Sequence, residues 1–375
     1  MNPDNKSFFG GLESLRGVAA LIVVFLHISW PNPLTQLRFF HNGYLMVDLF
    51  FVLSGFVICF NYGQKIGSAK DIGHFMFLRF GRLYPLHLFC LIAFLGIEVA
   101  KWVGESKFNL VPTASSAFSV NNTSSFIAHL LLIQSFCPFA NYSFNGPSWS
   151  ISTEFYAYLV FAIAAVCFSK RKYILIVSSF SVLLTAFLLI HFGISGDTSF
   201  TGWSFIRCIL GFFTGILTYH IYNQYHFRIA RWSESVAFCL LVTLVIFMSI
   251  KDNPQIDGIL ALPIFSALII VIAAEPAGSF SRAINSFPLR WLGQISYSIY
   301  LMHFMVLMFI SRCAIYIQNR FSSNDRDTIG LVFVFVAIGL VLFISQLTYQ
   351  WIEKPFQNKS RELSQKYFGD WQTHA

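Results

Sequence analysis

Long apolar stretches separated by short polar segments run through nearly the whole chain. Ten of them approach the roughly 20 residues that a helix needs to cross a bilayer. They fall at about 17–30, 44–62, 83–103, 147–168, 173–192, 203–222, 236–250, 258–274, 291–313 and 329–350. An eleventh stretch, 125–138, is shorter and ends at a proline, which favours a re-entrant or interfacial segment. The pattern therefore predicts an all-α protein, a polytopic membrane helix bundle of about ten transmembrane helices that forms one domain over residues 1–375.

Composition excludes an ordinary soluble domain. The 375 residues are 56% hydrophobic and only 11% charged, whereas soluble domains carry roughly 25% charged residues. The formal net charge is +8, yet the basic residues fall in short groups between apolar stretches, so a surface for nucleic acid is not expected. The 7 cysteines are scattered singly, which predicts neither a disulfide framework nor a metal site.

The distribution of lysine and arginine predicts the orientation of the bundle. If the N-terminus is cytoplasmic and 125–138 does not cross the membrane, 17 of the 25 basic residues lie on the inner side and 8 on the outer side. If that segment crosses, the division becomes 11 inside and 14 outside. The positive-inside rule therefore favours ten spans with both termini in the cytoplasm. In this topology the loop around Lys170 is also cytoplasmic, residues 104–146 are outside, and 351–375 is a short cytoplasmic tail.

Two ionisable residues occur in the first apolar stretch. Arg16 and His27 are eleven residues apart, so a helix presents them on nearly the same face, about 16.5 Å apart along its axis. Ionisable residues inside a span usually face a partner or an aqueous cavity, which makes this face a functional candidate. The alternative is that Arg16 extends to the inner membrane surface and His27 is a hydrogen-bonded core residue.

Further polar side chains are expected near the depth of His27. Asp48, near the outer end of the second span, is predicted to lie beside the imidazole of His27, where it would fix the tautomer and raise the basicity that a general base needs. The alternative is a solvated Asp48 at the membrane interface. Glu154 and His303 are predicted at a similar level. Glu154 needs a partner, and the buried cation that the sequence offers is Arg207.

Basic residues are expected to gather toward the inner side. Arg79 and Arg82 are three residues apart where the third span begins, and with Arg16 they form a group of cations suited to phosphates or other anions. Alternatively, these arginines only satisfy the positive-inside rule. The sequence contains no HExxH, CxxC, GxSxG or Walker-type motif, which argues against a zinc protease, an α/β hydrolase and an ATPase.

The order of these segments resembles that of a known family over nearly the whole chain. Acyltransferase family 3 has the same succession of LESLRGVAALIVVFLHI, GYLMVDLFFVLSGFVI, FLRFGRLYP, PSWSISTEFYAYLVF, FIRCILGFFTG, ISYSIYLMHF and WIEKPF. This family of bacterial multi-span membrane proteins acylates surface polysaccharides and other extracytoplasmic acceptors. Arg16 and His27 match the spacing of its first helix, and Arg79 and Arg82 match its RxxR pair. The SGNH domain of some members is not expected, because the chain ends soon after the last span.

The resemblance implies an O-acyltransferase of the bacterial inner membrane, with acyl-CoA, usually acetyl-CoA, as donor and a hydroxyl of a glycan or another molecule as acceptor. The residues assigned to catalysis are His27, Asp48 and Glu154. Those assigned to the CoA phosphates are Arg16, Arg79 and Arg82. Those assigned to substrate binding are Trp149, Arg207, Tyr297 and His303. His27 either deprotonates the acceptor hydroxyl or carries the acyl group itself.

Two other functions are compatible with the residues alone. A proton-coupled transporter or flippase of a glycan or lipid would use His27, Asp48 and Glu154 as a proton relay and would not need CoA. Transporters are often built from inverted repeats, which this sequence does not show. A structural membrane subunit would leave the polar residues within the spans unexplained.

Overall fold

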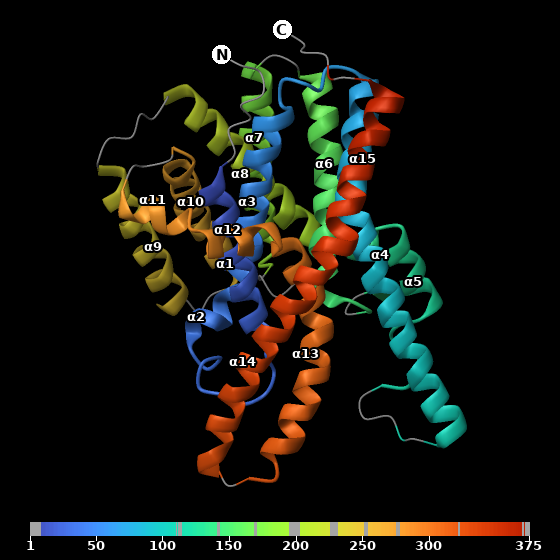
Figure 1. Cartoon of the computed structure of the whole chain (residues 1–375). Helices are drawn as coiled ribbons and strands as arrows, with labels where there is room; N and C mark the ends of the chain where they lie inside the picture. The colour runs from blue at the N-terminus through green and yellow to red at the C-terminus, as the bar shows by residue number, and fades with distance from the viewer. Residues whose placement is uncertain are drawn as a thin grey trace.

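The computed structural model describes residues 9–109, 111, 115–140, 143–168, 171–194, 203–225, 232–250, 254–274, 278–321, 323–369 and 371. Throughout these residues the regular structure is helical, with no β-strand (Figure 1). The helices are α1 Gly10–Leu26, α2 Arg38–His41, η1 Asn42–Tyr44, α3 Leu45–Tyr62, α4 Ala69–Phe108, α5 Thr123–Leu130, η2 Gln134–Phe136, η3 Pro138–Ala140, η4 Gly146–Ser148, α6 Trp149–Cys167, α7 Arg171–His191, α8 Trp203–Tyr225, α9 Trp232–Ile250, α10 Pro254–Ala273, α11 Ser279–Ile284, α12 Phe287–Gln294, α13 Ser296–Gln318, α14 Ser323–Thr348, η5 Tyr349–Glu353 and α15 Lys354–Phe368.

The predicted all-α membrane bundle is confirmed. Within the described residues, 8 of the ten predicted stretches form helices long and apolar enough to cross a membrane. The other two stretches form shorter helices: α1 has 17 residues, and the apolar part of α9 is Glu234–Ile250, also 17 residues. Lys170, in the predicted cytoplasmic loop, lies outside the described residues.

The segment after α4 enters the bundle without crossing it. Its helix α5 has only 8 residues, about 12 Å, and short 3-10 turns follow it. Ser143, Asn145 and Ser148 are buried there, and Asn145 donates a hydrogen bond to the carbonyl of Leu301. Non-helical backbone is tolerated at membrane depth where protein surrounds it. The prediction of a non-spanning segment over 125–138 is therefore confirmed.

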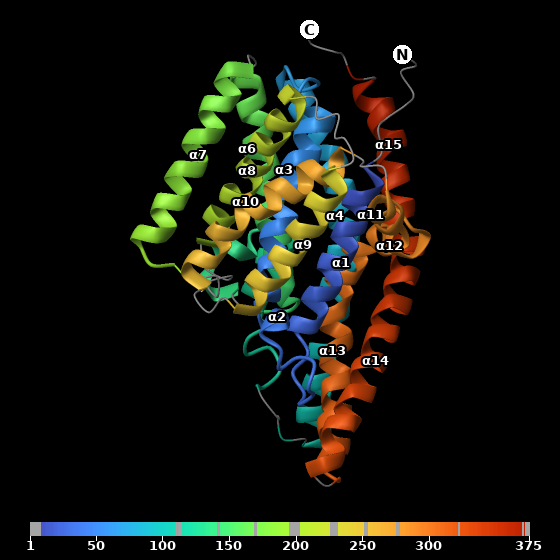
Figure 2. The same cartoon turned by 90° about the vertical axis from the view of Figure 1, so that its left-hand side faces the viewer.

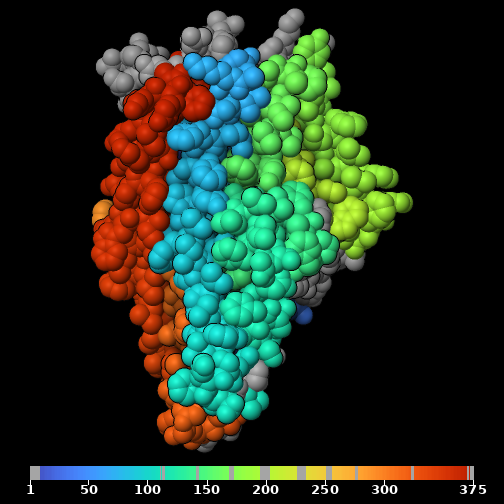
Figure 3. Space-filling model, turned by 90° about the vertical axis from the view of Figure 1, so that its right-hand side faces the viewer, coloured from blue at the N-terminus to red at the C-terminus, as the bar shows by residue number. Residues whose placement is uncertain are grey.

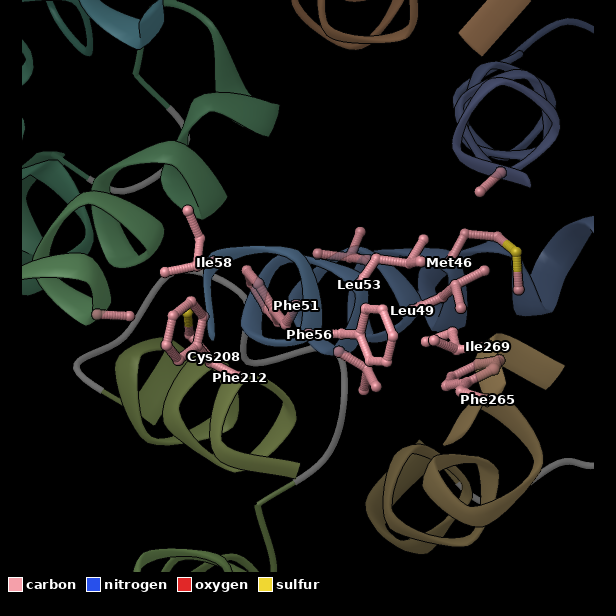
Figure 4. Packing of buried hydrophobic residues seen from close by; sticks show 14 of the residues in the cluster. Met46, Leu49, Phe51, Leu53, Phe56, Ile58, Cys208, Phe212, Phe265 and Ile269 are labelled. Carbon is pink, nitrogen blue, oxygen red and sulfur yellow. The ribbon is translucent and has the colours of Figure 1, made fainter. Parts of the chain in front are cut away.

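Helix α3 runs through the centre of the core and lies very close to α8. Figure 4 shows its apolar side chains packed against Phe212 of α8 and Phe265 of α10. A methyl group at Gly55 would collide with the backbone of Phe212, and one at Gly215 would collide with the backbone of Val52. The glycines therefore permit a contact distance that larger residues exclude, and this contact fixes which side chains of α3 and α8 meet.

Two helices are much longer than a bilayer is thick. Helix α4 has 40 residues, and α14 continues through the π-helical turn η5 into α15, so that 325–368 forms one rod. Helix α15 lies along the first half of α4 (Figures 1 and 3). The contact is close, because a methyl group at Gly81 would collide with Ser360. Most of the segment predicted as a tail is thus a packed helix.

The two ends of the bundle differ in shape. At one end, which we call the α15 end, α15 packs against the start of α4. At the opposite end, the α13–α14 hairpin and the last turns of α4 extend beyond the other helices (Figures 1 and 2).

Candidate active site

A small cavity of about 60 Å³ lies between α1, α3, α4, α6 and α13. We call it the central cavity. Apolar side chains of α3 form part of its wall, and polar side chains from the other helices face them. The polar lining consists of Arg16, Arg82, Ser150, Glu154, Tyr158, Ser296, Tyr297 and Tyr300.

Arg16 and Arg82 bring two guanidinium groups to the central cavity. Neither forms a hydrogen bond or a close ion pair with any residue that the structure describes. They repel each other electrostatically, and Glu154 attracts both of them at longer range. Two guanidinium groups beside a cavity leave several donors for an anionic ligand.

Glu154 also faces the central cavity, at the level of these arginines. Ser54 and Tyr158 each donate a hydrogen bond to its Oε1 atom, at 2.6 Å in both cases. Neither His27 nor His303 lines this cavity, so the prediction that Glu154 shares a level with the histidines is wrong. The reason is that α6 begins inside the protein: Pro147 and Ser148, which precede it, are already buried.

Asp48 and Arg207 form a buried ion pair between α3 and α8. Arg207 donates from Nε to Oδ1 of Asp48 at 2.7 Å and from Nη2 to Oδ2 at 2.9 Å, a two-point geometry typical of strong pairs. The guanidinium also lies over the ring of Trp149, 5.7 Å from its centroid. The predicted Glu154–Arg207 pair is therefore wrong, because the close α3–α8 contact directs Arg207 to Asp48.

His27 and His303 form a pair of imidazoles near the end of α1. The Nδ1 atom of His27 lies 2.9 Å from the carbonyl of Val23 and 3.3 Å from Nε2 of His303. Since a carbonyl only accepts, Nδ1 of His27 carries the hydrogen, and its Nε2 atom has the free lone pair. The prediction that Asp48 orients His27 is wrong, because the carbonyl of Val23 fixes the tautomer and Asp48 binds Arg207 instead.

Tyr300 connects the central cavity to the histidine pair. Its ring lines the cavity and lies 5.9 Å from the ring of His303, which is one helical turn further along α13. Ser150 donates a hydrogen bond to its hydroxyl, and the hydroxyl donates to the carbonyl of Pro147. Tyr297, a predicted substrate-binding residue, lines the central cavity as well and donates a hydrogen bond to the carbonyl of Leu83.

A much larger cavity, of about 490 Å³, opens at the α15 end between α3, α4 and α15. We call it the large cavity. Arg79 lines it, and Nη2 of Arg79 donates to the hydroxyl of Tyr62 at 2.9 Å. Arg82 lines both the large and the central cavity. The three arginines predicted as one group are thus divided: Arg16 in the central cavity, Arg79 in the large one and Arg82 between them.

Comparison with known proteins identifies the domain. The family model of acyltransferase family 3, described as an acyltransferase domain, matches residues 9–350. The chain belongs to this family. The resemblance found in the order of the sequence segments is therefore confirmed.

Relatives of this acyltransferase 3 chain are named as O-acetyltransferases. "Putative peptidoglycan O-acetyltransferase YrhL" of Bacillus subtilis (strain 168) is 26% identical over 397 residues, which cover 96% of this chain and 57% of the relative. "O-acetyltransferase OatA" of Staphylococcus aureus (strain NCTC 8325 / PS 47) is 25% identical over 382 residues, which cover 94% of this chain and 58% of the relative. The chain thus spans a little more than half the length of these relatives. No solved structure matches it significantly.

One charged residue of this acyltransferase 3 site escaped the sequence analysis. Glu353 is buried on η5 and accepts hydrogen bonds from Ser298 at 2.8 Å and from Gln357 at 3.0 Å. Its carboxylate attracts Arg82 and Arg16 electrostatically. The available signal was its place in WIEKPF, directly after the last apolar stretch.

Proposed function

We propose that this acyltransferase 3 chain is a membrane O-acetyltransferase, which moves an acetyl group from cytoplasmic acyl-CoA to a hydroxyl of an extracytoplasmic glycan. The acceptor to examine first is peptidoglycan, which the name of the Bacillus relative contains. The α15 end is then cytoplasmic, and the membrane is the inner membrane of a bacterium.

The single observation that carries the proposal is that the large and the central cavity adjoin, with Arg82 lining both. The large cavity is wide and cationic, and the central cavity is narrow, with two guanidinium groups at its wall. An acyl-CoA likewise has a wide charged part and a narrow part, because its phosphates and adenine are bulky whereas its pantetheine arm is thin. A donor bound along this path brings its thioester toward Tyr300 and the histidine pair.

The reaction at the histidines needs a base with a free lone pair. In the direct route, Nε2 of His27 takes the proton of the acceptor hydroxyl while the oxygen forms a bond to the thioester carbonyl carbon. The carbon–sulfur bond then breaks, and the proton passes to the CoA thiolate. In the two-step route, Nε2 first forms a bond to the carbonyl carbon, the carbon–sulfur bond breaks and CoA leaves as the thiolate. The acceptor hydroxyl then attacks the acyl-histidine, the carbon–nitrogen bond breaks, and the hydroxyl proton passes to the thiolate. Both routes use the same nitrogen.

The remaining polar residues position these groups. Asp48 holds Arg207 beside Trp149, next to the start of α6. Glu154 and Glu353 balance part of the charge of Arg16 and Arg82 electrostatically, which leaves the donors of both guanidinium groups available to a ligand in the central cavity.

Cysteine labelling tests the proposed topology. We expect a cysteine introduced at Ser106, in the last turns of α4, to react with an impermeant maleimide added outside the cell. A cysteine at Arg171 should react only after permeabilisation, since the positive-inside rule places it in the cytoplasm. The background is the protein with its 7 native cysteines replaced. Strong labelling at Arg171 in intact cells contradicts the ten-span topology.

Arg82→Lys tests the path of the donor. Lysine keeps the charge but loses the fork of donors that binds phosphate at two points. We expect the KM for acetyl-CoA to rise about tenfold with little change in kcat, which corresponds to roughly 1.4 kcal/mol. The matched control is Arg290→Lys on α12, which lines neither cavity. An unchanged KM in Arg82→Lys would mean that Arg82 does not bind the donor and only satisfies the positive-inside rule.

A further inference from the structure

We propose that α15 and Trp371 complete a nucleotide subsite, so that the large cavity binds the 3′-phosphoadenosine diphosphate part of an acyl-CoA. This inference rests on the proposed function and specifies which part of the donor the C-terminal helix recognises. Of the 15 described residues that line the large cavity, 6 come from α15 and the residues after it, and Figure 3 shows α15 lying along α4.

The size of the large cavity fits this part of the donor. Its volume of about 490 Å³ lies in the range of roughly 300–1,000 Å³ that is usual for sites of small molecules and cofactors. The central cavity, at about 60 Å³, has room for a thin chain only. A ligand that occupies both must therefore keep its bulky end at α15.

The charge of the large cavity is of one sign. Lys65, Arg79, Arg82 and Arg361 line it, and no Asp or Glu is among the described residues that do so. The Nε atom of Arg79 is buried and has no hydrogen-bond partner among the described residues. A buried donor without a partner is unfavourable, and a phosphate oxygen in the large cavity would satisfy it. The 3′-phosphate and the diphosphate supply several such oxygens.

An aromatic surface adjoins these cations. The imidazole of His74 stacks on two rings, with its centroid 4.0 Å from that of Trp371 and 5.1 Å from that of Phe368. Gly369 ends α15 with φ +77°, a conformation that favours glycine, and the chain then turns Trp371 onto His74. Trp371 and His74 both line the large cavity. Aromatic rings are the usual surfaces on which purine bases stack.

Phosphate recognition alone would also fit the headgroup of an anionic phospholipid. The aromatic rings favour the nucleotide, because a lipid headgroup has no flat base to stack on them. The experiment therefore includes both ligands.

Binding measurements on the purified full-length protein, in nanodiscs of neutral lipid, test the subsite. The ligands are CoA, 3′-dephospho-CoA, adenosine 3′,5′-bisphosphate and S-acetylpantetheine. The variants are Arg361→Gln and Trp371→Ala, with Lys366→Gln and Tyr367→Ala as controls, because the last two residues are exposed on α15 and do not line the large cavity. Arg361 is exposed, so its substitution removes no buried contact. Thermal melting in the same nanodiscs confirms that each variant is folded.

We expect Arg361→Gln to weaken CoA binding about tenfold, the loss that one contact to a phosphate is expected to cause. Trp371→Ala should weaken the binding of CoA, dephospho-CoA and adenosine 3′,5′-bisphosphate by a similar factor. Binding of S-acetylpantetheine should be the same in all the variants, and the controls should match the wild type with every ligand.

Three results overturn the inference. If both variants bind CoA as the wild type does, α15 is not part of the donor site. If anionic phospholipid displaces CoA while adenosine 3′,5′-bisphosphate does not bind, the large cavity is a headgroup site. If the wild type binds no CoA at all, the proposed function fails as well. The first two results overturn only this inference and leave the proposed function standing, so the two failures can be told apart.

Discussion

His27→Ala is expected to lower the rate of acyl transfer by about 10²–10⁴-fold, the contribution of a positioned general base. The reason is geometric: Nδ1 of His27 is held by the carbonyl of Val23, so Nε2 has the lone pair that both proposed routes require. The protein should reach the membrane in normal amount, because the side chain is partly exposed and forms no ion pair with a residue that the structure describes. The measurement is acetyl ester content of the surface glycan, together with the amount of protein in the membrane.

His191→Ala is the matched control for this variant. His191 is an exposed histidine at the end of α7, so its loss should change neither activity nor abundance. If His27→Ala keeps more than about a tenth of the wild-type rate, the imidazole is not the base.

Removing one partner of the Asp48–Arg207 pair is expected to destabilise the protein strongly. Asp48 is 3% exposed, and truncating one side of a buried pair leaves the other charge without compensation, at a cost of about 3–5 kcal/mol. Asp48→Asn and Arg207→Gln should therefore each reduce the amount of folded protein in the membrane. The double variant should recover most of that amount, because neither charge remains.

Activity separates a structural role of the pair from a functional one. If the pair only stabilises the bundle, the double variant regains acyl transfer along with abundance. If Arg207 contacts the acceptor, the double variant is folded but inactive, and this is the result that we expect. Removing the exposed pair Lys359–Glu362 on α15 is the control and should have no effect. Wild-type abundance in both single Asp48 and Arg207 variants contradicts the account of this ion pair.

The spans were predictable from the sequence, whereas the contacts between them were not. An apolar stretch of the right length determines a membrane helix almost by itself, so each of the ten predicted spans contains a helix. Which side chains meet depends on how closely two helices approach. The partner of Arg207 follows from the glycine contacts of α3 with α8, and no spacing within one helix indicates it.

Depth was the second quantity that the sequence did not determine. Counting residues from Pro147 assumes that this proline lies at the membrane surface, but it is buried, so Glu154 lies deeper than the count suggests. The helix α15 had a readable signal. Phe356, Ser360, Ser364 and Phe368 recur every four residues, which is the period of a helix with one packed face.

Transfer across a reconstituted membrane tests the central claim most directly. Purified protein is placed in proteoliposomes, with radiolabelled acetyl-CoA on one side only and peptidoglycan fragments of distinguishable length on the two sides. The account predicts acetyl esters on the fragments across the membrane from acetyl-CoA, for the protein molecules whose α15 end faces the donor, and almost none with His27→Ala. Acetylation confined to the side that holds acetyl-CoA, or an equal yield with His27→Ala, would contradict it.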